Sequence, residues 1–282
     1  MKSLILCLSI LCLASLVEGQ DLASKLQSVS VTIKSGDGEG SGVIITRDVI
    51  VDDKGTREPI QFIWTAGHVV DNLRSVRTIV VDGVDKKVVE YKDAQMVQEL
   101  TERGRKIGEI KLDAKVIRYS DSENGEDLAL LMIRKRDFLK EGAVFYESDE
   151  PLNLGTELYH VGSLLGQDGA NSMTNGIISQ IGRVLKLGSG DGVVFDQTTV
   201  TAFPGSSGGG VFLKTDHKEG KAGQYIGMLV RGAGNGGSFN FIVPVRRMRE
   251  WAKKEGIMWA IDTKTEAPPL KDILNPPVKE TK

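Results

Sequence analysis

The chain has 282 residues, of which 40% are hydrophobic and 26% charged, and its formal net charge is -2. This composition is typical of folded soluble proteins and excludes disordered and fibrous classes. The balance of acidic and basic residues gives no dense positive surface that would release counterions from nucleic acid. We therefore expect no nucleic-acid partner.

The first twenty residues have the pattern of a secretory signal peptide. Lys2 precedes an apolar run from Leu4 to Val17, and small and polar residues follow. We expect cleavage between Gly19 and Gln20, which makes residues 1–19 a signal peptide and the mature protein secreted or periplasmic. A membrane anchor is the alternative, but the run is shorter than the ~20 apolar residues that span a bilayer. No stable membrane insertion is expected after cleavage.

Both cysteines, Cys7 and Cys12, lie within this apolar run. Once the signal peptide is removed, the mature protein has no thiol and no disulfide. An exported protein of this kind depends on core burial alone, which a domain of this size supplies. This favours a bacterial or phage origin over the disulfide-rich digestive enzymes of animals.

From Ser28 onward, short apolar runs rich in Val, Ile and Thr alternate with Gly, Asp, Asn and Ser. This pattern predicts an all-β protein of many short strands. Two segments look helical: residues 95–106 predict a charged surface excursion, and residues 245–255, after Pro244, predict a closing helix with one apolar stripe. Residues 263–282 are rich in proline and charge and predict a flexible tail.

The segment FPGSSGGG at residues 203–210 contains the pattern Gly-x-Ser-Gly-Gly, with Ser207 as its serine. Glycines allow a tight turn that exposes the serine hydroxyl. The N–H groups of Gly205 and Ser207 then point at one spot, where they stabilise the oxyanion of a tetrahedral intermediate. An ordinary glycine-rich hairpin is the structural alternative.

The segment FIWTAGHVV places His68 after a β-type run that ends in small residues. Imidazole has a pKa near working pH and is the usual general base for a serine hydroxyl. A buried structural histidine is the alternative for His68. His160 and His217 have no such setting, and we assign them structural roles.

In the segment ENGEDLALL, a predicted turn places Asp127 at the start of an apolar strand. A carboxylate there needs a partner, and accepting the imidazole N–H would fix the histidine tautomer. An aspartate that caps its own turn is the structural alternative, and Glu126 is the competing carboxylate. We prefer Asp127 because the apolar strand continues directly from it.

In the order His, Asp, Ser, the segments TAGHVV, DLALL and PGSSGGG resemble the three motifs of trypsin- and chymotrypsin-like serine peptidases. The chain is most similar to the disulfide-free bacterial, Deg-type branch, without a PDZ domain. The resemblance implies a peptidase domain over residues 20–262 built from two packed six-stranded β-barrels. The first, over about 28–138, would carry His68 and Asp127; the second, over about 139–245, would carry Ser207.

The same resemblance implies that Thr201 lies near the base of the primary pocket and that Leu229, Val230 and Arg231 form the strand edge that binds the substrate backbone. A pocket for Lys or Arg needs an opposing carboxylate, and position 201 has none. This favours small or apolar residues before the scissile bond. Attraction of an acidic residue by Arg231 remains the alternative.

These observations predict a secreted serine endopeptidase that cleaves protein or peptide substrates through an acyl-enzyme, with His68, Asp127 and Ser207 as its triad. The chemistry requires no metal or organic cofactor. One alternative is a catalytically silent trypsin-like binding module, and another is an esterase on the same triad. No residue pattern predicts an oligomeric state.

Overall fold

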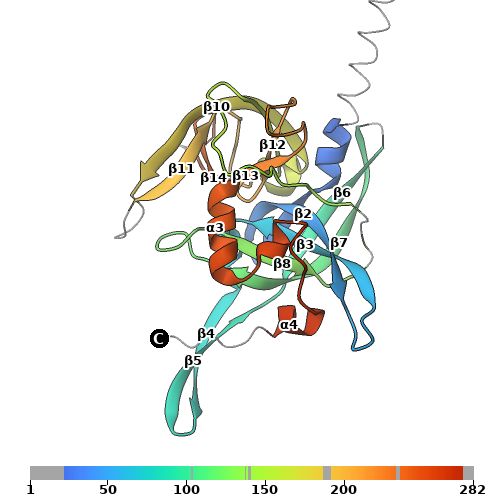
Figure 1. The fold of residues 1–282 in the computed structure, drawn as a ribbon, viewed down its shortest axis with the longest axis vertical. Coiled ribbons are helices and arrows are strands. Elements are labelled where there is room, and N and C mark those ends of the chain that lie inside the picture. Colours follow the sequence, from blue (N-terminus) through green and yellow to red (C-terminus); the bar gives the residue numbers. More distant parts are fainter. Residues whose placement is uncertain are drawn as a thin grey trace, which may run out of the picture.

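The structure is a computed structural model that describes residues 22–102, 104–136, 138, 141–186, 192–232 and 236–275. Strands are the main secondary structure, and all of them except one hairpin form two closed barrels that pack against each other (Figure 1). The predicted signal peptide, residues 1–19, lies outside the described residues. The same is true of residues 276–282 of the predicted tail.

The first barrel has the strand order β1-β2-β3-β8-β7-β6. Its strands are rich in β-branched residues, and side chains such as Ile33, Phe62 and Leu130 are fully buried. β-branched side chains pack well on a pleated surface, which explains why these segments form strands. The strands are β1 (Ser30–Ser35), β2 (Gly38–Ile50), β3 (Arg57–Thr65), β6 (Ala94–Glu102), β7 (Arg105–Tyr119) and β8 (Ala129–Ile133).

The second barrel has the order β10-β11-β14-β13-β12-β9, and Phe212, Tyr225 and Ile242 fill its core. Two closed six-stranded barrels confirm the all-β prediction and the architecture implied by the resemblance. The strands are β9 (Glu157–Gly162), β10 (Ser172–Leu185), β11 (Val193–Thr198), β12 (Gly210–Leu213), β13 (Tyr225–Gly232) and β14 (Asn240–Pro244).

The helices are short, and one of them joins the two barrels. α3 (Val245–Glu255) confirms the predicted closing helix; it starts after Pro244 and ends at Gly256, whose φ is +71°. Trp251 of α3 packs edge-on against Trp64 of β3, with ring centroids 5.8 Å apart. The helix that follows the last strand of the second barrel therefore packs against the first barrel. The remaining helical segments are residues 22–28, α2 (Gly67–Val70), η1 (Asp71–Leu73), η2 (Gly166–Gly169), η3 (Met258–Ala260) and α4 (Leu270–Leu274). In the part of the chain that the structure describes, no helix has the length and apolarity of a membrane span.

The prediction of a helical excursion at residues 95–106 is wrong. These residues form most of β6 and the start of β7, and Met96 and Val97 are buried. Val97 pairs with Thr32 of β1, and this pairing closes the first barrel. Tertiary pairing therefore outweighs the charged local pattern that suggested a surface helix.

The prediction of a flexible tail is wrong for residues 263–275. Ala267, Leu270 and Ile273 are buried, and Lys271 of α4 forms an ion pair of 3.0 Å with Asp53. The few apolar side chains of this segment are spaced so that each meets the outside of the barrels, which compensates for the ordering of its polar residues.

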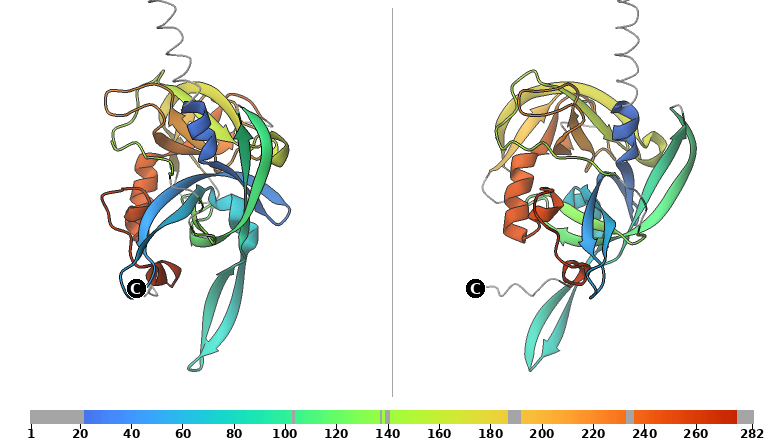
Figure 2. Two further views of the ribbon diagram at one scale, coloured as in Figure 1. Left: turned by 90° about the vertical axis from the view of Figure 1, so that its right-hand side faces the viewer. Right: turned by 45° about the vertical axis from the view of Figure 1, so that its right-hand side comes forward.

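A separate two-stranded hairpin, β4 (Arg74–Val81) and β5 (Val84–Tyr91), projects from the first barrel (Figures 1 and 2). Its two strands pair with each other only, and Val80 near its tip is 69% exposed. The barrels therefore position the site described below, whereas this hairpin extends away from them.

Candidate active site

His68 lies on α2, directly after the end of β3, where the chain passes close to the loop that precedes β8. A side chain at Gly67 would place its Cβ 2.1 Å from the main-chain oxygen of Ser120. Only glycine permits this approach. The small residues before the histidine thus bring His68 against the segment that carries Asp127.

Asp127 ends a tight turn, residues 120–127, which we call the acid turn. Its backbone has a φ of +55°, in the left-handed region, and its N–H donates to the main-chain oxygen of Asp121 at 3.0 Å. The Asp121 carboxylate in turn accepts the N–H groups of Glu123 and Asn124 at 3.0 and 2.7 Å. Aspartate is well suited to such a turn because its side chain bonds the local backbone.

The Asp127 carboxylate contacts His68 twice. Both of its oxygens lie 3.0 Å from Nδ1 of the imidazole, and Oδ1 also accepts the main-chain N–H of His68 at 3.0 Å. Asp127 is 1% exposed, so these donors satisfy a buried charge. A carboxylate on this side holds the proton on Nδ1 and leaves Nε2 as the basic nitrogen.

Glu126, the competing carboxylate, is directed elsewhere. It forms an ion pair with Arg247 of α3. The other amino group of Arg247 donates to the Val194 main-chain oxygen at 2.7 Å, and its guanidinium lies 4.9 Å from the ring centroid of Phe195. The second barrel therefore holds the acid turn through Arg247, a contact that sequence reasoning missed because its partners are 121 residues apart.

Ser207 lies on the loop between residues 203 and 210, which we call the nucleophile loop. Its main-chain oxygen accepts the N–H of Ser41 at 2.7 Å. At the neighbouring Gly208, an added Cβ would lie 3.0 Å from the main-chain nitrogen of Ala66, two residues before His68. The loop is thus adjacent to the histidine segment. Among the described residues no hydrogen bond joins Ser207 to His68, and hydrogen bonds at a substrate-free serine site are often long before substrate binds.

Gly205 has a backbone that few other residues adopt. Its φ is +93°, and an added Cβ would lie 2.3 Å from the main-chain oxygen of Ser163. The Pro204 carbonyl accepts the N–H of Leu165 at 2.8 Å. Because N–H and C=O of a trans peptide point in opposite directions, this bond turns the Gly205 N–H away from Leu165.

The proposed pocket residue Thr201 lies just before the nucleophile loop. Its hydroxyl is 3.2 Å from the Ser238 hydroxyl. Next to it, Ala202 and Gly237 exchange two main-chain hydrogen bonds of 3.1 and 3.0 Å. These bonds join the segment before the nucleophile loop to the segment before β14. These contacts place a hydroxyl, and no carboxylate, at position 201.

The three predicted substrate-binding residues of β13 differ in their surroundings. Leu229 and Val230 are buried, and the main chain of Leu229 bonds that of Gly208 and Gly209 at 2.8 and 3.0 Å. Arg231 donates from Nη2 to the main-chain oxygen of Ser122 at 2.9 Å. β13 thus supports the nucleophile loop, and Arg231 is a second contact between the second barrel and the acid turn.

His160 of β9 is fully buried beneath the nucleophile loop. Its Nδ1 lies 3.0 Å from the main-chain oxygen of Gly210, and its ring occupies the space that a side chain at Gly209 would need. Burial lowers its pKa to about 4, against a smaller opposing effect of the Gly210 hydrogen bond. A neutral histidine that supports the loop agrees with the structural role assigned from the sequence.

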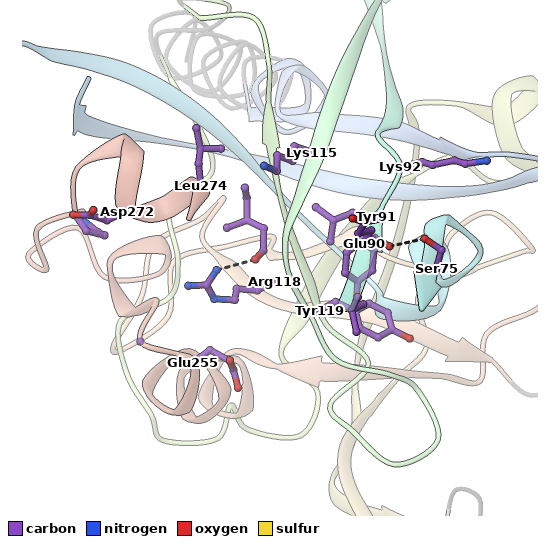
Figure 3. Close-up of a pocket in the computed structure, with 15 residues that line it drawn as sticks. Ser75, Glu90, Tyr91, Lys92, Lys115, Arg118, Tyr119, Glu255, Asp272 and Leu274 are labelled. Carbon is purple, nitrogen blue, oxygen red and sulfur yellow. Dashed lines mark hydrogen bonds between the residues drawn. The ribbon is translucent and has the colours of Figure 1, made fainter. Parts of the chain in front are cut away.

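A cavity of about 1100 Å³ lies at the base of the hairpin, apart from the triad residues (Figure 3). Tyr91 and Tyr119 line one side, with ring centroids 5.6 Å apart, and Arg118, Glu255 and Asp272 lie toward the other. Within the described residues, no group of three or more His, Cys, Asp or Glu side chains is arranged to hold a metal ion.

The sequence matches the trypsin-like peptidase domain over residues 40–220. The chain therefore belongs to the trypsin-like peptidase family.

Among curated proteins, the chain is 33% identical over 190 residues to the serine protease Do-like HtrA of Lactobacillus helveticus. That alignment covers 67% of this chain and 35% of the relative, so the chain matches about a third of the length of that protein.

Solved structures show the same fold. The HtrA-type protease AlgW with a tripeptide superposes with a TM-score of 0.57 at 18% identity, covering 85% of this chain and 63% of that one. The serine endoprotease from Yersinia pestis gives 0.55 at 16% identity, covering 84% and 66%. At these identities the likeness establishes the fold.

Proposed function

We propose that the chain is an exported serine endopeptidase that hydrolyses peptide bonds with His68, Asp127 and Ser207. One observation carries the proposal: the buried Asp127 carboxylate binds Nδ1 of His68 beside the glycine-rich loop of Ser207. His68 is 37% exposed, so its other ring nitrogen is accessible from the solvent side. Family membership supports this assignment.

In the proposed reaction, Ser207 Oγ attacks the substrate carbonyl while its proton passes to Nε2 of His68. The carbonyl π electrons move to the oxygen, and the N–H groups of Gly205 and Ser207 stabilise the resulting oxyanion. The C–N bond then breaks as His68 gives its proton to the leaving amine, which leaves an acyl-enzyme. Water, deprotonated by His68, adds to the ester, and Ser207 leaves with the proton.

Asp127 acts through the imidazole and remains ionised throughout. It holds the Nδ1 proton, and it stabilises the imidazolium that forms during each proton transfer. The contact from Oδ1 to the main-chain N–H of His68 also fixes the direction from which the carboxylate approaches.

For specificity, we propose small or apolar residues before the scissile bond. The hydroxyl at Thr201 and the closure of the pocket walls between Ala202 and Gly237 support this choice. Arg231 directs Nη2 to the Ser122 carbonyl, and capture of an acidic residue by its guanidinium is the alternative.

Export is proposed from the apolar run at the amino terminus, which would be removed near Gly19. The mature chain would then act in the periplasm or outside the cell. Amino-terminal sequencing of the protein recovered from those fractions tests this proposal, and an uncleaved, cell-retained chain contradicts it.

The test of catalysis compares the mature protein with its Ser207→Ala variant, using a fluorophosphonate probe and unfolded casein. We expect labelling and cleavage by the parent alone, and the cut sites report the pocket preference. A folded parent that neither labels nor cleaves from about pH 6 to 9, around the ordinary pKa of histidine, supports a silent binding module instead. Labelling with hydrolysis of esters but not peptides supports an esterase.

A further inference from the structure

Ser41 of β2 uses every polar group it has, and most of its bonds reach the second barrel. It is 0% exposed. Its N–H donates to the Ser207 carbonyl, and its carbonyl accepts the Thr65 hydroxyl, each at 2.7 Å. Its own hydroxyl donates to the Gly205 carbonyl at 2.7 Å and accepts the main-chain N–H of Ser163 at 2.7 Å.

The direction of the hydroxyl proton follows from these partners. The N–H of Ser163 can only donate, so it occupies a lone pair of Ser41 Oγ, and the Gly205 carbonyl can only accept. The Ser163 side chain is itself held by the Thr32 hydroxyl, 2.6 Å away. The Ser41 proton is therefore directed at the nucleophile loop in every arrangement that satisfies this network.

Gly205 depends on such bonds because it has no side chain to hold it. The peptide before it is held by the Leu165 N–H on the Pro204 carbonyl, and the peptide after it by the Ser41 hydroxyl on its own carbonyl. Glycine adopts many backbone conformations, so bonds to its flanking peptides hold its φ at +93°; the Ser206 N–H also donates to the Phe203 carbonyl at 2.9 Å. Without the hydroxyl, the partly buried Gly205 carbonyl would lose its donor, and the bond from the Ser206 N–H to the Phe203 carbonyl would be left to hold this peptide.

We propose that Ser41 is a positioning residue for the oxyanion donors: its side-chain hydroxyl, reaching across the barrel interface, fixes the Gly205 peptide so that the N–H groups of Gly205 and Ser207 converge. The proposal rests on the acyl-enzyme function above and goes beyond it, because it assigns part of the transition-state stabilisation to a residue outside the triad. The bond is made by the first barrel to the second, so docking of the barrels completes the oxyanion site.

The experiment compares Ser41→Ala with Ser30→Ala as a matched control. Ser30 lies on the adjacent strand β1, is 2% exposed, and donates its hydroxyl to the Leu26 carbonyl, away from the nucleophile loop. Ser30→Ala removes one buried hydroxyl bond, whereas Ser41→Ala removes the bonds to both Gly205 and Ser163. Each is assayed for kcat and KM on a peptide substrate, for melting temperature, and for affinity toward a peptide boronic acid. The boron of that probe takes the Ser207 oxygen to form a tetrahedral anion, and the serine proton passes to His68.

We expect Ser41→Ala to lower kcat/KM by about 10- to 100-fold through kcat, since deletion of an oxyanion donor itself costs about 10²- to 10³-fold. Affinity for the boronic acid should fall by the same factor, because it too carries an oxyanion. Ser30→Ala should lower the melting temperature less and leave kcat/KM and the boronic acid affinity close to those of the parent. Should Ser41→Ala not fold, Ser41→Cys replaces it: the thiol is a weaker donor and should give a smaller loss in the same direction.

Equal kinetics in Ser41→Ala and Ser30→Ala would overturn the proposal, as would a fall in kcat with unchanged boronic acid affinity. An active parent with this result leaves the peptidase function intact and removes only the role of Ser41. A parent that neither labels nor cleaves overturns both proposals.

Discussion

His68 and Asp127 are joined directly within the first barrel, whereas the loop that carries Ser207 is held by both barrels. The pair of the first barrel is joined directly, with the carboxylate 3.0 Å from Nδ1 and the acid turn closed by its own backbone bonds. The nucleophile loop instead accepts a hydrogen bond from Ser41 of the first barrel and packs on the buried His160 of its own barrel. The imidazole and its carboxylate thus meet within one barrel, while the nucleophile loop also depends on how the two barrels pack.

The largest effect on activity is expected from Asp127, the carboxylate that binds His68. Asp127→Asn should keep the fold but lower kcat/KM by about 10³- to 10⁴-fold, because the amide favours the wrong tautomer of His68. Steady-state kinetics with a peptide substrate measure this. Glu126→Gln is the control, since Glu126 faces Arg247, and it should lose far less activity. If both variants lose equally, Glu126 shares the role assigned to Asp127.

The next effect tests the support beneath the nucleophile loop. The buried His160 has its pKa lowered to about 4, from 6.5, whereas the unfolded chain binds a proton at about the ordinary value. As pH falls from about 6.5 to 4, protons therefore favour the unfolded state, and the free energy of unfolding should drop by about 3 kcal/mol, with no further loss from this group below pH 4.

Denaturant titrations of the parent and of His160→Gln across this range measure the loss. The variant should show a flatter pH dependence, while His217→Gln, in a turn of the second barrel, should behave like the parent. An unchanged slope in His160→Gln would assign the acid sensitivity to other groups.

A smaller effect is expected where the second barrel holds the acid turn. Arg247→Met should lower the free energy of unfolding by about 1–2 kcal/mol, because Arg247 is nearly buried but its partner Glu126 is partly exposed. Its kcat/KM should fall by about 5-fold through a slight displacement of Asp127. Arg246→Met is the matched control: Arg246 precedes Arg247 on α3 and pairs with Asp196, away from the acid turn. The idea fails if Arg246→Met reduces kcat/KM as much.

The smallest effect on stability and activity is expected in the projecting hairpin, which carries none of the three proposed catalytic residues. Val80→Ala should change the free energy of unfolding by less than about 0.5 kcal/mol and leave kcat/KM unchanged, because the side chain is largely exposed. Ile63→Val, which removes one methyl group from the buried core of the first barrel, should cost about 1 kcal/mol. A large loss in Val80→Ala would indicate that the hairpin is covered in solution.

Local patterns were sufficient where neighbouring residues decide the outcome. The glycines around Ser207, the small residues before His68 and the turn before Asp127 form short motifs typical of acyl-transfer chemistry, so the three candidate positions were recognisable without coordinates. The same holds for α3, where proline at the start, glycine at the end and one apolar stripe define a helix.

Contacts between distant segments could not be predicted in this way. Residues 95–106 were misread as helical because their pairing with β1 decides their conformation, and residues 263–275 were misread as a tail because their few apolar side chains meet the barrels. Glu126 could be separated from Asp127 only by the position of Arg247.

By itself, the sequence of this protein determined the class of fold, the closing helix and the residue types available for acyl transfer, since periodicity, glycine and short motifs act over a few residues. The tertiary structure alone decided which carboxylate meets the imidazole and how the Gly205 peptide is held. The bond from Ser41 to Gly205 spans 164 residues, and its physical cause is the packing of a buried hydroxyl against a partly buried carbonyl at the barrel interface, where the two groups satisfy each other.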